Sequence, residues 1–296
     1  MILATKTKLA IDTALEVDGG AKFRSLLREA INACGDAFDP EEQTFRSHLG
    51  CSLLGKQCAR ELWYSFRWAS KKEVSGRIQR LFNRGHMEEG RFVALLRMIN
   101  CLVLPHDETG KQYRVSGHLG HVGGSLDGVV RDLPDLAPGT WALQEFKTHS
   151  DKSFKKVAAE GVRAAKPEHY VQQQLYMHHY NLKFALYGSV NKNDDDLHLE
   201  IVANDEITAL QFLDRGAGIV DSPEPPPKIS SSPGWFACKF CDAYAICHQD
   251  KSMLVNCRTC RAALPIADGA WVCRARQQKL SKELQLVGCD VHDPIK

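Results

Sequence analysis

The chain has 296 residues, which is long enough to bury a substantial core as one large domain or one domain with a small addition, so a cofactor is not needed merely to fold. Its 38 lysines and arginines against 36 aspartates and glutamates exclude a global basic field, and nucleic-acid binding would need a local patch. No apolar run approaches the roughly 20 residues that span a bilayer, and the N-terminal segment lacks a signal-peptide pattern, so we expect a cytoplasmic protein without a membrane partner.

The first part of the chain predicts helices. Residues 1–40 are weakly patterned, with helical spacing over residues 22–33 and a break at Asp39-Pro40, and we treat them as an N-terminal extension. Apolar and aromatic residues then recur at helical spacing over residues 49–68 and again over residues 78–100. Two helices are therefore expected before the first strands.

The middle of the chain alternates strands and helices. Strand patterns cover residues 113–132, 141–148, 183–192 and 197–203. Helical patterns cover residues 166–182, which follow Lys166-Pro167, and the region around residues 209–216. The order predicts an α/β fold with a central mixed sheet flanked by helices. A segment rich in proline and serine, residues 221–234, reads as an extended linker.

Two acids and a lysine on predicted strands stand out. Asp127 lies in GGSLDGVV, and Glu145 and Lys147 lie in LQEFKT, where alternate residues share one face of a strand. Carboxylates on neighbouring strands supply the hard oxygen ligands that Mg²⁺ or Mn²⁺ prefers. A lysine beside them can orient or help deprotonate a water molecule. Taken alone, a Glu-x-Lys pair is also typical of an exposed strand edge.

Four motifs follow one another along the chain. They are RGHMEEG with His86, Gly-Ser-Leu-Asp127, Glu145-Phe146-Lys147, and the pair Gln172 and Tyr176. This order resembles the RecB-like branch of the P-D-(D/E)-X-K nuclease superfamily, over residues 49–248. The resemblance implies a restriction-endonuclease-like core, metal ligands from His86, Asp127, Glu145 and the Phe146 carbonyl, and catalytic roles for Asp127, Glu145, Lys147, Gln172 and Tyr176. For His86, an ordinary surface or core histidine stays open as the alternative.

Eleven cysteines without an export signal argue against a disulfide framework. Cys238, Cys241 and Cys247 form a C-x2-C-x5-C cluster, and three thiolates need a fourth ligand. Cys58, followed by Arg60 and Trp63, resembles the lone upstream cysteine of RecB/AddB-type iron–sulfur nucleases and of CRISPR-adaptation nucleases. That resemblance implies a structural [4Fe–4S] cluster on these four cysteines. Zinc stays open as the metal, and Cys51 competes for the fourth place but lacks the following arginine.

The last segment carries a second cysteine set. Cys257, Cys260 and Cys273, completed by Cys289 or His292, predict a small Zn²⁺-binding ribbon or knuckle, with free reduced cysteines as the alternative. The remaining cysteines have no partner at ligand spacing and are expected to be small buried apolar residues. They are Cys34, Cys51 and Cys101.

Local cations interleave with aromatic residues in the first half of the chain, as binding to phosphates and stacking on unpaired bases would require, although packing in a core is the alternative for the rings. The cations are Arg60, Arg67, Lys71, Lys72, Arg77, Arg80 and Arg84, with Lys152, Lys155 and Lys156 further on. The aromatic residues are Trp63, Tyr64, Phe66 and Trp68.

Together these patterns predict three parts: an N-terminal extension (residues 1–40), a nuclease core with the four-cysteine cluster (residues 41–250) and a zinc module (residues 251–296). The expected activity is that of a metal-dependent DNA exonuclease on single strands or duplex ends, similar to phage recombination exonucleases. It would serve DNA recombination, repair or processing, in the host cytoplasm if phage-encoded, beside a single-strand annealing or recombinase protein. A non-catalytic nucleic-acid-binding metalloprotein, or a nuclease for RNA or nucleotide messengers, are the alternatives.

Overall fold

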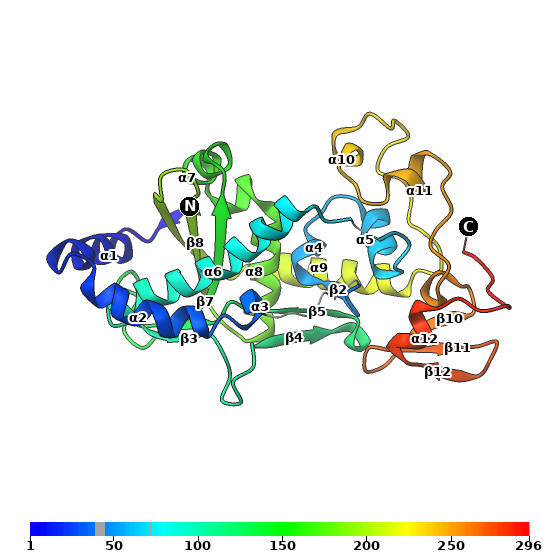
Figure 1. Ribbon diagram of the computed structural model, residues 1–296, viewed down its shortest axis with the longest axis horizontal. Helices are drawn as coiled ribbons and strands as arrows, with labels where there is room; N and C mark the ends of the chain where they lie inside the picture. The colour runs from blue at the N-terminus through cyan, green and yellow to red at the C-terminus, as the bar shows by residue number, and fades with distance from the viewer. Residues whose placement is uncertain (39–44, 72, 296) are drawn as a thin grey trace. The chain divides into compact units, whose positions relative to one another are not determined.

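The computed structural model describes residues 1–38, 45–71 and 73–295, which fall into two compact units (Figure 1). The first unit comprises residues 1–42, 74–115 and 125–209, and the second comprises residues 43–73, 116–124 and 210–296. The predicted break at Asp39-Pro40 and the predicted cation Lys72 lie outside the described residues. Within the described ranges, no helix is both long enough and apolar enough to cross a membrane.

A six-stranded sheet forms the centre of the first unit, in the order β1-β9-β8-β7-β6-β3. Strands β7 and β8 are parallel, whereas the neighbouring pairs on either side are antiparallel, so the sheet is mixed. This confirms the predicted α/β class with helices flanking a central mixed sheet. The strands are β1 (Ile2–Leu3), β3 (Leu102–Leu104), β6 (Val129–Arg131), β7 (Trp141–His149), β8 (Phe184–Asn191) and β9 (Leu197–Ala203).

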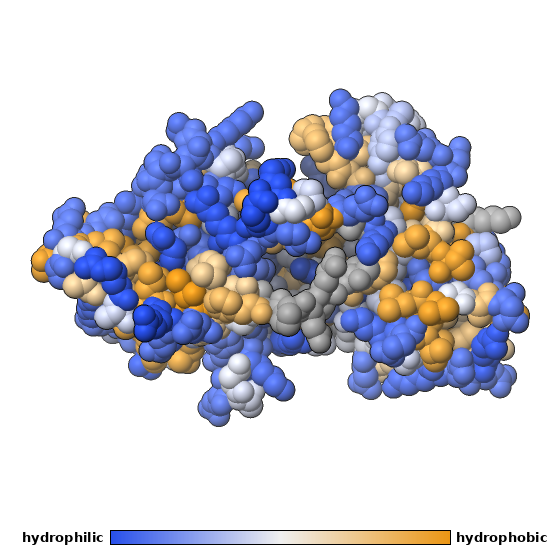
Figure 2. Space-filling view, in the orientation of Figure 1, coloured by the Kyte–Doolittle hydropathy of each residue, from blue (hydrophilic) through white to orange (hydrophobic). Residues whose placement is uncertain are grey.

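Two groups of helices contact this sheet. Because β7 and β8 are parallel, the chain needs a long crossover between them, and α7 and α8 provide it. The first group is α1 (Thr5–Val17), α2 (Ala21–Asn32), α3 (Gly35–Phe38) and α6 (Gly76–Met98), and the crossover group is α7 (Asp151–Ala165) and α8 (Pro167–His179). Helix α1 leaves Leu9 and Val17 exposed, and Figure 2 shows apolar surface over α1 and α2.

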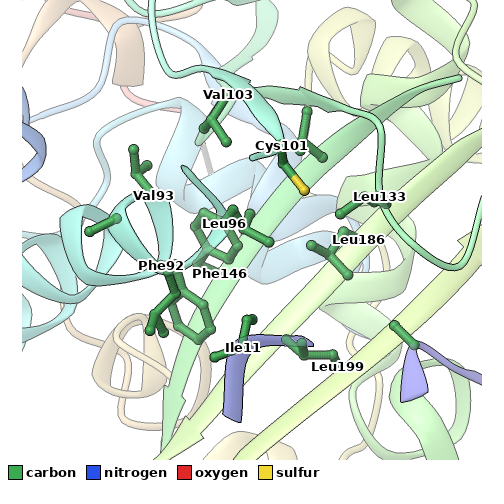
Figure 3. Packing of buried hydrophobic residues seen from close by; sticks show 14 of the residues in the cluster. Ile11, Phe92, Val93, Leu96, Cys101, Val103, Leu133, Phe146, Leu186 and Leu199 are labelled. Carbon is green, nitrogen blue, oxygen red and sulfur yellow. The ribbon is translucent and has the colours of Figure 1, made fainter. Parts of the chain in front are cut away.

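The main core of the first unit lies between the sheet and helices α1, α2 and α6 (Figure 3). Phe92 of α6 stacks on Phe146 of β7, with ring centroids 4.5 Å apart and planes 5° from parallel. Gly188, the register partner of Phe146 on β8, lies beneath this stack, and a Cβ there would come within 3.0 Å of the Phe146 ring. Because side chains alternate along a strand, Glu145 and Lys147 point to the opposite face of β7.

The observed elements differ from the predicted ones in several places. Residues 49–68, predicted as one helical stretch, form the short strand β2 (Leu49–Gly50), α4 (Cys51–Leu54) and α5 (Ala59–Phe66), with glycines at both ends of α4. Helix α7 was not predicted, because its lysines masked the buried pair Phe154 and Val157 at helical spacing. Strands β1 and β3 are too short to leave a readable pattern.

The second unit contains small elements. One sheet has the order β2-β5-β4, and the other, near the C-terminus, is the antiparallel sheet β10-β11-β12. Residues 222–235 form neither helix nor strand, as their proline and serine content predicts. The strands are β4 (Arg114–Gly117), β5 (Val122–Ser125), β10 (Ala263–Ile266), β11 (Ala270–Cys273) and β12 (Gln278–Leu280). The remaining helices are η1 (His118–Gly120), α9 (Glu206–Asp221), α10 (Phe236–Lys239), α11 (Tyr244–His248), η2 (Cys257–Thr259) and α12 (Lys282–Leu286).

Two buried arginines join parts of the second unit that are far apart in sequence. The Arg258 guanidinium donates to Gln285 Oε1 at 2.8 Å and to the carbonyls of Phe66 and Ser47 at 3.0 Å each, and it lies 3.7 Å from the Trp68 ring centroid. Arg67 donates to the Arg258 carbonyl at 3.2 Å. Burial lowers the pKa of Arg258 to about 9, yet carbonyls and an aromatic face still hold its charge.

The prediction of Arg67 as a DNA-binding cation is therefore wrong, because its side chain is only 2% exposed. The neighbouring rings are also buried, which confirms core packing and contradicts stacking on bases. They are Trp63, Tyr64, Phe66 and Trp68. Cys51 and Cys101 are buried, as expected for small apolar residues, whereas Cys34, for which the same was expected, is only half-buried.

Candidate active site

The predicted acids and lysine meet in the first unit. Glu145 and Lys147 lie on one face of β7, and Asp127 lies in the turn between β5 and β6. The Phe146 backbone N–H donates to Asp127 Oδ2 at 2.7 Å, which fixes the Asp127 carboxylate beside β7. Gly128 permits this turn: its φ is +132°, and an added Cβ would lie 2.4 Å from Gln144 Nε2. A residue with a side chain would be strained there.

Lys147 bonds to two neighbouring oxygens on its own strand. Its Nζ forms an ion pair with Glu145 Oε1 and donates to the Phe146 carbonyl at 3.1 Å. Glu145 is completely buried, and neither of its oxygens accepts a hydrogen bond of ordinary geometry from a described residue. A buried carboxylate normally receives several hydrogen bonds. Glu145 is thus far less satisfied than a structural carboxylate would be.

The charges around Lys147 are unbalanced. Burial raises the pKa of Glu145 well above its usual range; Lys147 opposes this rise, while Asp127 and Glu89 add to it. Burial and the Asp127 charge raise the pKa of Glu89, on α6, to about 7. Burial by itself would lower the pKa of Lys147, but the carboxylates of Glu145 and Asp127 raise it overall. Three carboxylates therefore share one ammonium group.

This donor set fits a divalent cation by its chemistry. Carboxylates and a backbone carbonyl are hard oxygen ligands, which suit Mg²⁺ or Mn²⁺. Lys147 Nζ already contacts Glu145 and the Phe146 carbonyl, two of the proposed ligands, which shows that a positive charge is stable beside them. In the described ranges, no group of three or more His, Cys, Asp or Glu side chains is already arranged to hold a metal ion.

His86 and Glu89 lie one helical turn apart on α6, with His86 Nδ1 3.4 Å from Glu89 Oε1. The sequence showed Glu89 on the face of His86 but gave it no role, and the structure adds it to the site through its interaction with Asp127 and Lys147. Its spacing of three residues from His86 is the signal that could have identified it. The role of His86 as a metal ligand stays a prediction.

Gln172 and Tyr176 lie on one face of α8 and are buried. Gln172 Nε2 donates to Tyr176 Oη at 3.4 Å, so the two side chains meet as their spacing of four predicts. Helix α8 packs on β7 and β8, the strands that carry or flank Glu145 and Lys147. Their contact with a substrate stays a prediction.

Exposed arginines lie on the first half of α6, where Figure 2 shows strongly hydrophilic surface. Arg77, Arg80 and Arg84 recur at helical spacing, are exposed and form no ion pair with a described residue. Two of the three α7 lysines differ, because Lys155 pairs with Asp151 at 2.9 Å and Lys156 with Glu160 at 3.8 Å. Helix α6 thus offers the freer positive charge to a phosphate backbone.

In the second unit, one pocket gathers the four cysteines predicted for an iron–sulfur cluster. They are Cys58, Cys238, Cys241 and Cys247, and Arg60, Glu61 and Tyr64 also line the pocket. Burial raises the pKa of Cys241 to about 11, and the charges of Glu61 and Cys58 contribute. Cys51, the competing residue, is buried and does not line this pocket. The fold brings together cysteines 180 positions apart in sequence, from Cys58 to Cys238.

The charges of the C-terminal cysteines influence one another, although no group of three or more described ligands there is arranged to hold a metal ion. Burial raises the pKa of Cys257, and the charges of Cys289, Cys273 and Cys260 add to the rise. The Asp293 backbone N–H points at Cys260 Sγ from 3.4 Å. His292 Nε2 lies 3.2 Å from Thr259 Oγ1, so His292 already has a hydrogen-bonding partner. Cys289 likewise interacts with Arg276, so both residues stay open as the fourth ligand.

Comparisons with known proteins give distant structural similarities. No protein-family model matches the chain, and no curated protein matches it. The fold is similar to the crystal structure of SSO0001, with a TM-score of 0.39, 14% identity, and coverage of 76% of this chain and 95% of that one. It is also similar to an alkaline exonuclease, LHK-Exo from Laribacter hongkongensis, with a TM-score of 0.41, 16% identity, and coverage of 58% and 86%. The complex of LHK-Exo with dAMP gives a TM-score of 0.40 at 16% identity, with the same coverage.

Proposed function

We propose that the chain is a divalent-metal-dependent nuclease that hydrolyses phosphodiester bonds in DNA, with Asp127, Glu145 and Lys147 at its centre. The observation that carries this proposal is Glu145, a fully buried carboxylate with no ordinary hydrogen bond from a described residue, beside two further carboxylates and one lysine. Charge arranged in this way is costly unless a ligand uses it. A divalent cation with a phosphate group is the ligand that this charge fits.

Each residue has a proposed role. Asp127, Glu145, the Phe146 carbonyl and His86 would hold Mg²⁺ or Mn²⁺. When bound, the cation would stabilise charge on the phosphate and lower the pKa of a bound water. The carboxylates raise the pKa of Lys147, so it is an ammonium at neutral pH, which donates hydrogen bonds and orients the water rather than removing its proton. Gln172 and Tyr176 would contact the cleaved strand.

The cleavage assay tests this proposal with end-labelled single-stranded DNA, duplex DNA and RNA, each with Mg²⁺, Mn²⁺ or a chelator. Wild type is compared with Asp127→Asn and with Glu108→Gln, an exposed control in the same unit. Metal-dependent release of label that Asp127→Asn loses and Glu108→Gln keeps would support the nuclease. Absence of cleavage on every polymer would favour a non-catalytic binding protein, and cleavage of RNA or a nucleotide messenger alone would move the substrate away from DNA.

Release of mononucleotides from ends would support the finer proposal of an exonuclease in phage recombination, repair or DNA processing, working beside a single-strand annealing or recombinase protein. Internal cuts would instead indicate an endonuclease. The exposed arginines of α6 would contribute to substrate binding, and each such contact should make binding weaker at higher salt.

We also propose a [4Fe–4S] cluster on Cys58, Cys238, Cys241 and Cys247, and Zn²⁺ on Cys257, Cys260, Cys273 and Cys289. The shared pocket supports the first site, and the raised pKa of Cys257, to which the charges of Cys289, Cys273 and Cys260 contribute, supports the second. Protein purified without oxygen should contain both iron and zinc and should be brown. Cys58→Ser should lose iron and keep zinc, whereas Cys51→Ser should keep both. Two zinc equivalents without iron would contradict the cluster.

A further inference from the structure

A buried hydrogen-bonded network lies on the same face of the sheet as Glu145 and Lys147. Tyr187 Oη of β8 lies 2.8 Å from Nε2 of His149, on β7, and 3.0 Å from Nδ1 of His169, on α8. Tyr187 is fully buried, and His149 is 5% exposed. We call these three residues the His–Tyr–His network. It joins two strands and one helix of the first unit through side chains alone.

The strand register places the network beside the candidate active site. Tyr187 is the register partner of Glu145 on the parallel strand β8, so the two side chains leave the same face of the sheet side by side. His149 follows Lys147 by two residues and therefore shares its face. Lys147 thus lies between Glu145 and His149 along β7, and the network flanks it.

The phenol of Tyr187 can satisfy both histidines at once. It has one proton to donate and lone pairs to accept, so it donates to one imidazole nitrogen and accepts from the other. Burial lowers the pKa of His149 to about 4, and the charges of Lys166 and Lys147 contribute. Burial lowers the pKa of His169 to about 2. Both imidazoles are therefore neutral and add no positive charge beside Lys147.

The network also fixes the start of α8. His169 precedes Gln172 by three residues and Tyr176 by seven, so all three lie on one face of the helix. Other side chains of α8 bond elsewhere: Tyr170 Oη donates to Asp205, and Gln174 Nε2 donates to the Ala203 carbonyl at 3.2 Å. Those bonds reach the end of β9 and the residues after it, whereas His169 reaches the β7–β8 pair.

We propose that the His–Tyr–His network is a positioning device that holds α8, with Gln172 and Tyr176, in a fixed place against Glu145 and Lys147. This inference rests on the proposed nuclease function. The three residues act through others, because no cation or phosphate is required to contact them. A shift of about 1 Å in a positioned group can reduce catalysis by up to about 100-fold.

Tyr187→Phe tests the network because it removes the hydroxyl and keeps the ring. We expect kcat for DNA cleavage to fall about tenfold or more, with KM little changed, because the substrate still binds and the chemical groups are misplaced. Tyr170→Phe is the matched control, because it removes another tyrosine hydroxyl bonded from α8 and should leave kcat unchanged.

Isosteric replacements separate a hydrogen-bonding role from simple filling of space. An asparagine amide approximates the position of Nδ1, and a glutamine amide approximates that of Nε2. His169 bonds through Nδ1 and His149 through Nε2, so His169→Asn and His149→Gln should keep most of kcat, while His169→Gln and His149→Asn should not. Equal effects of asparagine and glutamine at both positions would overturn the network's role, even if Tyr187→Phe did not fold.

The outcomes also separate this inference from the function on which it rests. A wild-type protein that cleaves no nucleic acid with any metal would overturn the nuclease and the network together. An active wild type with unchanged kcat in Tyr187→Phe would overturn the network and leave the nuclease standing.

Discussion

Glu145 in the first unit and Arg258 in the second are both buried charges, but their surroundings differ. Arg258 donates from Nε and from both terminal nitrogens to protein oxygens, and its guanidinium lies against Trp68. Glu145 has one ion pair, to Lys147, and no ordinary hydrogen bond from a described residue. Arg258 thus has its hydrogen-bonding partners within the chain, whereas Glu145 lacks such partners apart from its ion pair with Lys147.

The difference separates a structural charge from a functional one. Burying a charge costs free energy that hydrogen bonds must offset, and Arg258 has those bonds. Glu145 instead sits with Asp127 and Glu89 around a single lysine, where like charges raise one another's pKa. A buried charge whose hydrogen-bonding partners all lie within the protein stabilises the fold. A buried charge that lacks such partners indicates a site for a ligand.

The largest expected effect is on catalysis. Lys147→Met should reduce cleavage by about 10²- to 10³-fold, the loss expected when one positioned hydrogen-bond donor is removed from a transition state. Mn²⁺ binding, measured by calorimetry, should persist. Lys111→Met, at an exposed lysine of the first unit with no predicted role, serves as the control and should cleave normally. Full activity of Lys147→Met would exclude this lysine from the mechanism and would weaken the inference that the buried charge of Glu145 marks a functional site.

The next effect is on stability, at the structural charge. Arg258→Ala should lower the free energy of unfolding by about 3 kcal/mol or more, because it leaves two buried acceptors and the partly buried Ser47 carbonyl without this donor and opens a cavity. Chemical denaturation followed by circular dichroism measures it. Arg261→Ala, an exposed neighbour, should change stability by less than about 0.5 kcal/mol. Equal losses of unfolding free energy in the two variants would show that the buried contacts of Arg258 add no special stability.

The smallest effect is a pH dependence of stability in metal-free protein. The pKa of Glu89 is about 7 in the folded state against 4.5 for a free side chain, so the folded state binds this proton more tightly. Its stabilising contribution is complete below pH 4.5 and is lost as the pH rises to about 7, by up to about 3 kcal/mol. Urea denaturation at several pH values should show this slope, and Glu89→Gln should reduce it and leave the part that Glu145 contributes. Glu16→Gln, an exposed control, should retain the slope.

Parts of this fold could be predicted because their patterns are local. The alternation in β7 placed Glu145 and Lys147 on one face, and the spacing in α8 brought Gln172 to Tyr176. Helix α7 was not predicted, because a run of lysines is also typical of a solvated loop. Its buried face is defined by its packing on β8 and β9. Local periodicity could not reveal the parallel pairing of β7 with β8.

The site divides in the same way. Asp127, Glu145 and Lys147 could be selected from motif order, and the structure brings them together. Glu89 could have been suspected from its spacing of three residues from His86, but its interaction with Asp127 depends on where α6 crosses the sheet. Arg67 was read as an exposed cation, yet the partner that covers it, Arg258, is 191 positions away in sequence. Exposure is a tertiary property, so a charge pattern alone did not predict it.

The peptide at Phe146 has a consequence for how this site tolerates change. Its N–H holds Asp127, and its carbonyl accepts from Lys147, while its ring packs on Phe92 in the core. Exchange of the side chain cannot delete either backbone group, so position 146 should accept other flat rings of similar size with the polar geometry intact. Replacing the amide that precedes Phe146 with an ester would delete the N–H alone. At position 146 the side chain therefore contributes only its shape, and the polar contacts with Asp127 and Lys147 come from backbone atoms.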